Sequence, residues 1–228
     1  MYRQLPNQLT MLRLVLAGVF FLILNQYRYG GPGTAPQTLV LTLSFFIFIA
    51  AAVTDWLDGY LARRWQVESR FGRIMDPFCD KVLVIGAFIF LAGPRFVMPD
   101  REPHALLSLN MVSGVYPWMV VIILARELLV TGVRGELESA GVKFAANVFG
   151  KLKMILQSVA IPVVLFIIWL DPAVHTWTAW VRDGFVYATV LVTILSGIPY
   201  VLAAKQAVVD LPPPPPTPPT PPTTPGSE

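Results

Sequence analysis

Four aspartates stand out in a mostly apolar sequence, and their spacing suits chemistry on phosphates. Asp55 and Asp58 are three residues apart, so on a helix they share one face. Asp76 and Asp80 are four residues apart and would share a face of a second helix. A polar stretch at 64–70 separates the two pairs. The sequence therefore predicts a helical hairpin in which four carboxylates face one another.

Carboxylates gathered in this way need a counter-charge. Their mutual repulsion opposes ionisation, and each charged group costs roughly 2.5–3.5 kcal/mol at the centre of a membrane helix. Bound cations remove both costs, and an all-oxygen ligand set suits hard ions such as Mg²⁺ or Mn²⁺. Two such ions would form a clamp for phosphoryl chemistry. Gly59 and Ala62 leave room for a ligand near the backbone, and Arg63 offers a planar donor fork for phosphate.

The full motif is D-x2-D-G-x2-A-R-x8-G-x3-D-x3-D, which includes Gly72. It resembles the signature of the CDP-alcohol phosphatidyltransferases at every fixed position. The resemblance implies an all-α membrane enzyme with six transmembrane helices, which transfers a phosphatidyl group from CDP-diacylglycerol to an alcohol and releases CMP. It also implies roles for the motif residues. Two Mg²⁺ or Mn²⁺ ions would be held by Asp55, Asp58, Asp76 and Asp80, CDP-diacylglycerol would be bound by Gly59, Ala62 and Arg63, and Asp80 would act as the general base.

The composition is that of a membrane protein. Of 228 residues, 55% are hydrophobic and 14% are charged. The basic residues flank apolar spans and do not alternate with aromatic residues on a polar face, which argues against nucleic-acid binding. A single cysteine excludes an internal disulfide framework. Six apolar segments have about the length that a bilayer needs: 9–27, 38–61, 73–93, 114–137, 151–170 and 184–204.

The two ends of the chain and its charge distribution suggest a topology. Residues 6–13 match a PN-x-LT-x-x-R opening that is common in the same family, and we expect a short interfacial helix here, not a signal peptide. With the N-terminus inside, 13 of the 17 Lys and Arg residues fall on one side. The carboxylates would then face the cytoplasm from a bacterial inner (cell) membrane. Residues 1–210 would form the membrane domain, and the Pro/Thr-rich segment 211–228 a disordered tail.

A second group of polar residues lies in the stretch 126–157. Arg126 and Arg134 are eight residues apart, close to two helical turns. Lys151 and Lys153 open the next span from the same side, so the basic cluster holds two Arg and up to two Lys. Beside a metal site, Arg126, Arg134 and Lys151 would hold the phosphate of an acceptor. The stretch RE-x3-T-x2-R…G…A…GK-x-K…Q resembles bacterial phosphatidylglycerophosphate synthases, which implies glycerol 3-phosphate as the acceptor. Met154 stands where those proteins usually have Thr.

Several alternatives stay open at this stage. Within the family, the acceptor could be inositol phosphate, serine or phosphatidylglycerol, and the chain could form a homodimer. A divalent-cation transporter would also place acids inside its spans, but it has no use for Gly59, Ala62 and Arg63. A catalytically silent scaffold that displays the proline-rich tail would not need four intact aspartates. Ordinary anchoring at the membrane surface is the alternative role for the basic residues.

Overall fold

The structure is a computed structural model that describes residues 5–30, 37–65, 70–98, 110–139, 148–170 and 176–210. Within these ranges the chain forms six long α-helices and one short 3-10 helix. They are α1 (Leu5–Leu24), α2 (Thr38–Trp65), α3 (Arg70–Leu91), η2 (Pro94–Phe96), α4 (Pro117–Ser139), α5 (Val148–Leu170) and α6 (Thr176–Asp210). One antiparallel bridge, between Val97 and Met111, is the only extended pairing in the described ranges. The predicted all-α class is confirmed.

The helices have the character of membrane spans. Among the described residues, three helical segments are long and apolar enough to cross a bilayer, and α1 adds a shorter apolar run. Helices α3 and α4 match two further predicted spans but include several charged residues. Large apolar side chains are exposed on all six helices, as expected of a surface that faces lipid. The chain is therefore a multi-pass membrane protein. The three qualifying segments are Thr38–Tyr60, Val148–Leu170 and Trp177–Lys205.

The N-terminal segment differs from the prediction in one respect. The expected short interfacial helix is not a separate element, because Leu5–Leu24 form one continuous helix. Pro6 lies in its first turn, where backbone N–H groups have no partner within the helix, so the ring does not interrupt it. Thr10 and Arg13 are three residues apart on this helix, and both are buried. They therefore share the face of α1 that points into the protein.

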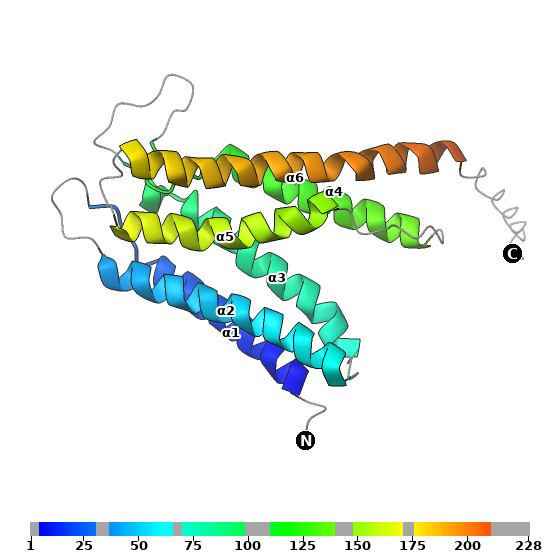
Figure 1. The fold of residues 1–228 in the computed structure, drawn as a ribbon, viewed down its shortest axis with the longest axis horizontal. Coiled ribbons are helices and arrows are strands. Elements are labelled where there is room, and N and C mark those ends of the chain that lie inside the picture. The colour runs from blue at the N-terminus through cyan, green and yellow to red at the C-terminus, as the bar shows by residue number, and fades with distance from the viewer. Residues whose placement is uncertain are drawn as a thin grey trace, which may run out of the picture.

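The six helices run alternately up and down in one bundle (Figure 1). Helix α1 lies along α2 and also contacts α3, while α5 packs against both α2 and α6, and α4 packs against α6. One end of the bundle holds the first residues of α1, α3 and α5 (Figure 1). The last residues of α2, α4 and α6 lie at this same end. We call this the site end, because the predicted functional residues lie on these helix termini. Helices α2 and α3 meet there and diverge toward the opposite end (Figure 1).

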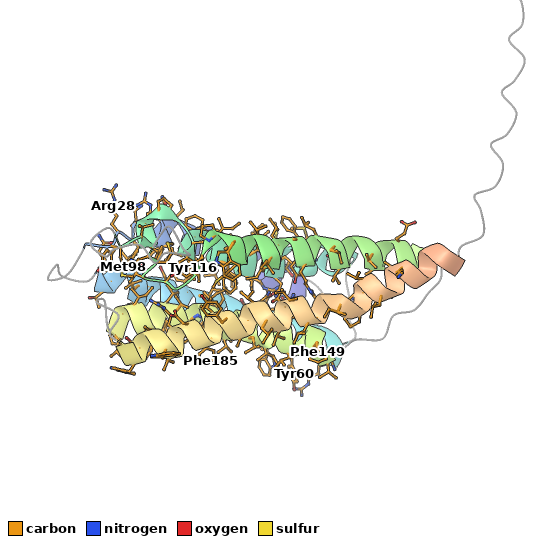
Figure 2. The ribbon with its side chains drawn as sticks, turned by 90° about the horizontal axis from the view of Figure 1, so that it is seen from above. Arg28, Tyr60, Met98, Tyr116, Phe149 and Phe185 are labelled. Atoms are coloured by element: carbon orange, nitrogen blue, oxygen red, sulfur yellow. The ribbon has the colours of Figure 1, made fainter. Side chains whose placement is uncertain are left out.

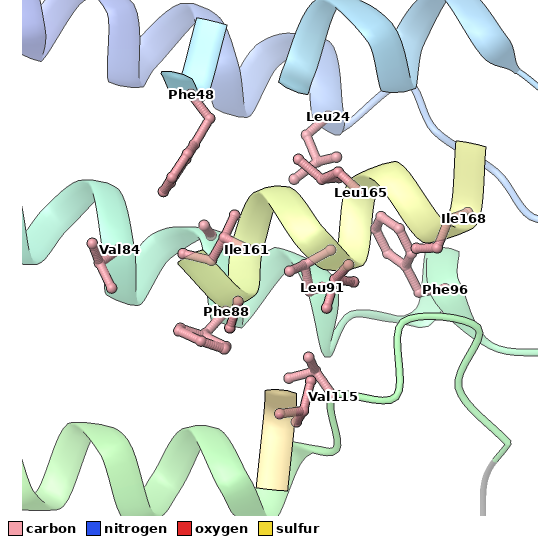
Figure 3. Packing of buried hydrophobic residues seen from close by; sticks show 14 of the residues in the cluster. Leu24, Phe48, Val84, Phe88, Leu91, Phe96, Val115, Ile161, Leu165 and Ile168 are labelled. Carbon is pink, nitrogen blue, oxygen red and sulfur yellow. The ribbon is translucent and has the colours of Figure 1, made fainter. Parts of the chain in front are cut away.

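The apolar core holds the helices together away from the site end. The rings of Phe20 on α1 and Phe48 on α2 lie 5.6 Å apart. Further along, buried side chains from α1, α3, η2 and α5 form one cluster (Figure 3). This cluster includes Leu24, Leu91, Phe96, Leu165 and Ile168, and all of them are nearly inaccessible to solvent. Packing of this density fixes how each helix is rotated about its axis, and that rotation decides which side chains face the site.

At the end opposite to the site end, a buried arginine links α6 to the segment that precedes α4. The guanidinium of Arg182 on α6 donates to the carbonyl oxygen of Val112 at 2.8 Å and forms an ion pair with Asp183. Figure 2 shows Met98, Tyr116 and Phe185 toward this end, with Tyr60 and Phe149 nearer to the site end.

Candidate active site

The aspartate pair of α2 lies on one face of the helix, as its spacing predicts. The Asp58 carboxylate is buried, whereas the Asp55 side chain is 45% exposed. Both carboxylates point toward α1, because both contact a residue of that helix. Gly59 follows on the next turn and is partly buried. Asp58 is thus turned into the bundle, whereas Asp55 lies at its edge.

Arg13 of α1 is the residue that the two carboxylates contact. One guanidinium nitrogen, Nη1, lies 2.5 Å from Oδ1 of Asp55, and Nη2 donates a hydrogen bond to Oδ2 of Asp58. Arg13 is only 1% exposed, so its charge is almost fully removed from water. Charges buried to this degree are found in proteins when they are paired. Arg13 of α1 therefore supplies positive charge beside the two aspartates of α2.

The α3 half of the motif is described in part. Asp80 lies on α3 and is partly buried. Its carboxylate interacts electrostatically with Asp55 and Arg13. The predicted approach of the α2 and α3 carboxylates is therefore seen for Asp80. Asp76 lies one turn earlier on α3, but its side chain is outside the described residues, as are the side chains of Ala62, Arg63 and Gly72.

A second buried ion cluster is centred on Glu127 of α4. Its Oε1 accepts a hydrogen bond from Nζ of Lys153 on α5 and lies 3.0 Å from Nη1 of Arg126. Glu127 and Lys153 are 6% and 7% exposed. The Asp80 carboxylate also interacts electrostatically with both of them. Asp80 therefore interacts electrostatically with charges of both the acidic and the basic cluster.

Arg126, which the sequence assigned to acceptor binding, is held by several groups in addition to Glu127. Its Nη2 donates to the backbone carbonyl oxygen of Ser196 on α6 at 3.4 Å, and its guanidinium lies 6.0 Å from the centre of the Tyr200 ring. These contacts fix the side chain between α4 and α6. An incoming anion would meet an arginine that is already oriented.

The other two predicted acceptor ligands, Arg134 and Lys151, have exposed side chains. Lys151 and Lys153 differ by two positions on α5, so they project from nearly opposite sides of the helix. Only one of the two can enter the bundle, and in the structure it is Lys153. The sequence placed Lys153 in the basic cluster but not among the three chosen phosphate ligands, and it assigned no site role to Arg13 or Glu127. The available signal was a charged residue inside an apolar segment, which usually has a functional partner.

Helices α3 and α4 are also joined directly near the site end. The Lys81 ammonium donates to the Thr131 hydroxyl at 2.6 Å, and that hydroxyl donates to the Glu127 carbonyl oxygen at 2.7 Å. Below this contact, an apolar groove of about 410 Å³ opens between the two helices, with Gly86 on one wall. Glu127 is one of the residues that line this otherwise apolar groove.

The described carboxylates are suited to a divalent cation by their chemistry. They offer only oxygen ligands, and a buried guanidinium already holds a positive charge between two of them. No three acidic, histidine or cysteine side chains converge closely enough to hold a metal ion among the described residues, a group that lacks Asp76. Bringing an ion to Asp55 and Asp58 would thus require their contacts with Arg13 to be rearranged.

These features define a class of protein: an all-α, multi-pass membrane protein with an acidic and a basic cluster side by side at one end of the bundle. A sequence profile of the CDP-alcohol phosphatidyltransferases matches residues 3–195. The chain belongs to this family. Its members generally depend on a divalent cation.

Similar curated proteins include several bacterial phosphatidyltransferases. The chain is 34% identical over 164 residues to a CDP-diacylglycerol–glycerol-3-phosphate 3-phosphatidyltransferase of Bacillus subtilis, covering 71% of this chain and 76% of that one. It is 36% identical over 204 residues to a probable phosphatidylglycerophosphate synthase of Mycobacterium tuberculosis, covering 90% and 83%. It is 28% identical over 208 residues to the Escherichia coli protein with the same name as the Bacillus one, covering 90% and 97%.

Proposed function

We propose that this protein transfers the phosphatidyl group of CDP-diacylglycerol to glycerol 3-phosphate, giving phosphatidylglycerophosphate and CMP. The observation that carries the proposal is the pair of clusters at the site end: Asp55, Asp58 and Asp80 beside Lys153 and Arg126. The first suits a cation-bound pyrophosphate and the second suits an anionic acceptor. The printed names of the similar bacterial proteins support the same choice of substrates.

The nucleotide half of the site would be formed by α2 and α3, the two helices that carry the aspartate motif. Asp55, Asp58, Asp76 and Asp80 would hold two Mg²⁺ or Mn²⁺ ions, and ions bound there would stabilise charge on the pyrophosphate. Gly59 and Ala62 would let the cytidine and its phosphates approach α2, and Arg63 would donate to a phosphate oxygen. The acyl chains of the lipid would stay in the surrounding bilayer.

The reaction needs one proton acceptor, and we assign this role to Asp80. The acceptor hydroxyl oxygen attacks the β-phosphorus of CDP-diacylglycerol, and a new oxygen–phosphorus bond forms. The bond from that phosphorus to the bridging pyrophosphate oxygen breaks, and CMP leaves with the bonding electrons. Asp80 takes the hydroxyl proton. Its place between the two clusters supports this assignment, because there it can reach a hydroxyl whose molecule is held by the basic residues.

The acceptor half would be formed by basic residues of α4 and α5. Arg126, Arg134 and Lys151 are the proposed phosphate ligands from their spacing, and we add Lys153 because it is buried beside Asp80. Holding the phosphate would place the hydroxyl for attack, which can supply much of the rate of a two-substrate reaction. The excess of Lys and Arg at the site end supports a topology in which this end faces the cytoplasm of a bacterial cell membrane.

The test is an assay of CMP release. Purified protein is given CDP-diacylglycerol with glycerol 3-phosphate, inositol phosphate, serine or phosphatidylglycerol, and we expect release with glycerol 3-phosphate. Release only with another acceptor would refute our choice of acceptor while keeping the transfer reaction.

Arg134→Ala provides a second test, because it removes a charge-assisted contact worth about 1.5–3 kcal/mol. We expect a strong rise in KM for glycerol 3-phosphate and a much smaller change in KM for CDP-diacylglycerol. An equal rise for both substrates would show that Arg134 is structural or serves the nucleotide. Lys151→Ala and Lys153→Ala, compared in the same assay, separate an exposed from a buried contribution to acceptor binding.

A further inference from the structure

Arg13 lies outside the D-x2-D-G-x2-A-R motif but contacts its two aspartates. It comes from α1, and 45 residues separate it from Asp58 along the chain. Its two terminal nitrogens are divided between Asp55 and Asp58, which our proposed function makes metal ligands. A residue in this place must affect how a cation enters the site.

Within the described part of the chain, Arg13 makes one hydrogen bond, from Nη2 to Asp58, and its contact with Asp55 is electrostatic. Nη1 lies 2.5 Å from Asp55 Oδ1 but does not meet hydrogen-bond geometry, and Nε has no acceptor among the described residues. A guanidinium with all its donors engaged would be difficult to displace, because each lost hydrogen bond leaves a buried donor without a partner. Arg13 is held mainly by the negative charge of the two carboxylates, and a divalent cation would be attracted to the same oxygens more strongly than the singly charged guanidinium.

We propose that Arg13 is a built-in counter-ion of the aspartate pair, which keeps the metal-free protein folded and competes with the metal ion for Asp55 and Asp58. Without it, two carboxylates on one turn of α2 would face each other at the bundle interior. With it, the pair is neutralised in part and kept in place. When a divalent ion binds, the guanidinium gives up at least one of its two carboxylates. Arg13 is thus a positioning residue and does not act on the substrate itself.

Loss of Arg13 should change the metal affinity in the opposite direction from loss of a residue that only supports the metal ligands. Loss of a group that only orients metal ligands weakens metal affinity about 10–100-fold. Loss of a competing positive charge strengthens affinity, because a cation and a guanidinium at the same carboxylates repel each other. The direction of the change in metal affinity therefore decides between the two roles, and it can be measured without any enzyme assay.

The experiment compares wild type, Arg13→Gln and Arg13→Lys in detergent. Mn²⁺ binding is followed by the electron paramagnetic resonance signal of the free ion, and thermal unfolding is measured with and without Mn²⁺. We expect Arg13→Gln to bind Mn²⁺ at least about tenfold more tightly than wild type. Its metal-free Tm should fall, and saturating Mn²⁺ should restore most of the loss. Arg13→Lys keeps the charge and should stay close to wild type in affinity.

Arg182→Gln is the matched control. Arg182 is also a buried, ion-paired arginine, but it lies at the opposite end of the bundle, where it donates to Val112. This variant should lower Tm equally with and without Mn²⁺ and leave Mn²⁺ affinity unchanged. A similar tightening in Arg182→Gln would mean that general loosening of the bundle, and not the local charge, controls affinity.

The outcomes separate this inference from the proposed function on which it depends. Wild-type protein that binds no Mn²⁺ would remove the metal site itself. Wild-type binding with equal or weaker affinity in Arg13→Gln would overturn the counter-ion role and leave the metal site standing. If Arg13→Gln unfolds without metal, it is purified in Mn²⁺ and its unfolding is followed as a chelator lowers the free ion. Failure to fold even in saturating Mn²⁺ would also overturn the inference.

Discussion

The ion cluster at Glu127 gives a stability prediction whose order of effects follows from the structure. Glu127 accepts from Lys153 and contacts Arg126, and both Glu127 and Lys153 are almost fully buried. The perturbations are Glu127→Gln, Lys153→Met and the double variant. Removing one partner from a buried ion pair costs about 3–5 kcal/mol, because the other charge is left without compensation. The two single variants nevertheless differ in the charges that remain unpaired in the cluster.

Glu127→Gln leaves the two cations of Arg126 and Lys153 around a neutral amide, so we expect it to fall in that 3–5 kcal/mol range. Lys153→Met leaves Glu127 with Arg126 at 3.0 Å, so the cost should be nearer to that of one charged hydrogen bond, about 1.5–3 kcal/mol. The double variant leaves Arg126 with its contacts to Ser196 and Tyr200. Its loss of stability should be smaller than the sum of the two single-variant losses, by about 0.5–3 kcal/mol.

The assay is thermal unfolding in detergent, and the free energies of unfolding of all variants are compared at the same temperature. For a chain of this size, 1 kcal/mol corresponds to roughly 2–4 °C in Tm, so Glu127→Gln should lower Tm by roughly 6–20 °C. The control is Glu136→Gln, an exposed acid on the same helix, where loss of a charge interaction should change stability by less than about 1 kcal/mol. Additive single variants, or a larger cost for Lys153→Met than for Glu127→Gln, would refute the reasoning.

Three further predictions concern other parts of the chain. Transfer activity should disappear in excess EDTA and return with Mg²⁺ or Mn²⁺, and Asp58→Asn should lower the rate by orders of magnitude; full activity in EDTA would contradict a metal-dependent mechanism. A Cβ at Gly86 would lie 2.3 Å from Cζ of Phe21, so Gly86→Ala should cost about 1–3 kcal/mol in a denaturation assay, whereas Gly132→Ala, which meets nothing within 4 Å, should not destabilise the protein. Truncation after Asp210 removes the Pro/Thr-rich segment and should leave activity and Tm nearly unchanged; a large loss of either would show that this segment docks on the enzyme.

The helices and much of the site's chemistry can be predicted from residue types and their spacing alone. Apolar segments of bilayer length predicted the helices, because backbone groups in lipid must be satisfied within the segment. The spacing of Asp55 and Asp58 fixed their common face, since helical geometry is local and needs no knowledge of the fold. The same argument placed Asp76 and Asp80 together on α3. The family signature followed from residue types and intervals alone.

Tertiary structure decided which residues complete the site. Arg13 reaches the aspartates only because α1 packs along α2, and no local rule connects two residues that are 45 positions apart. The choice between Lys151 and Lys153 depends on the rotation of α5 about its axis. That rotation is set by dense packing of Leu165 and Ile168 in the core, where small shifts are costly. Periodicity defines the faces of a helix, but only its neighbours determine which face turns inward.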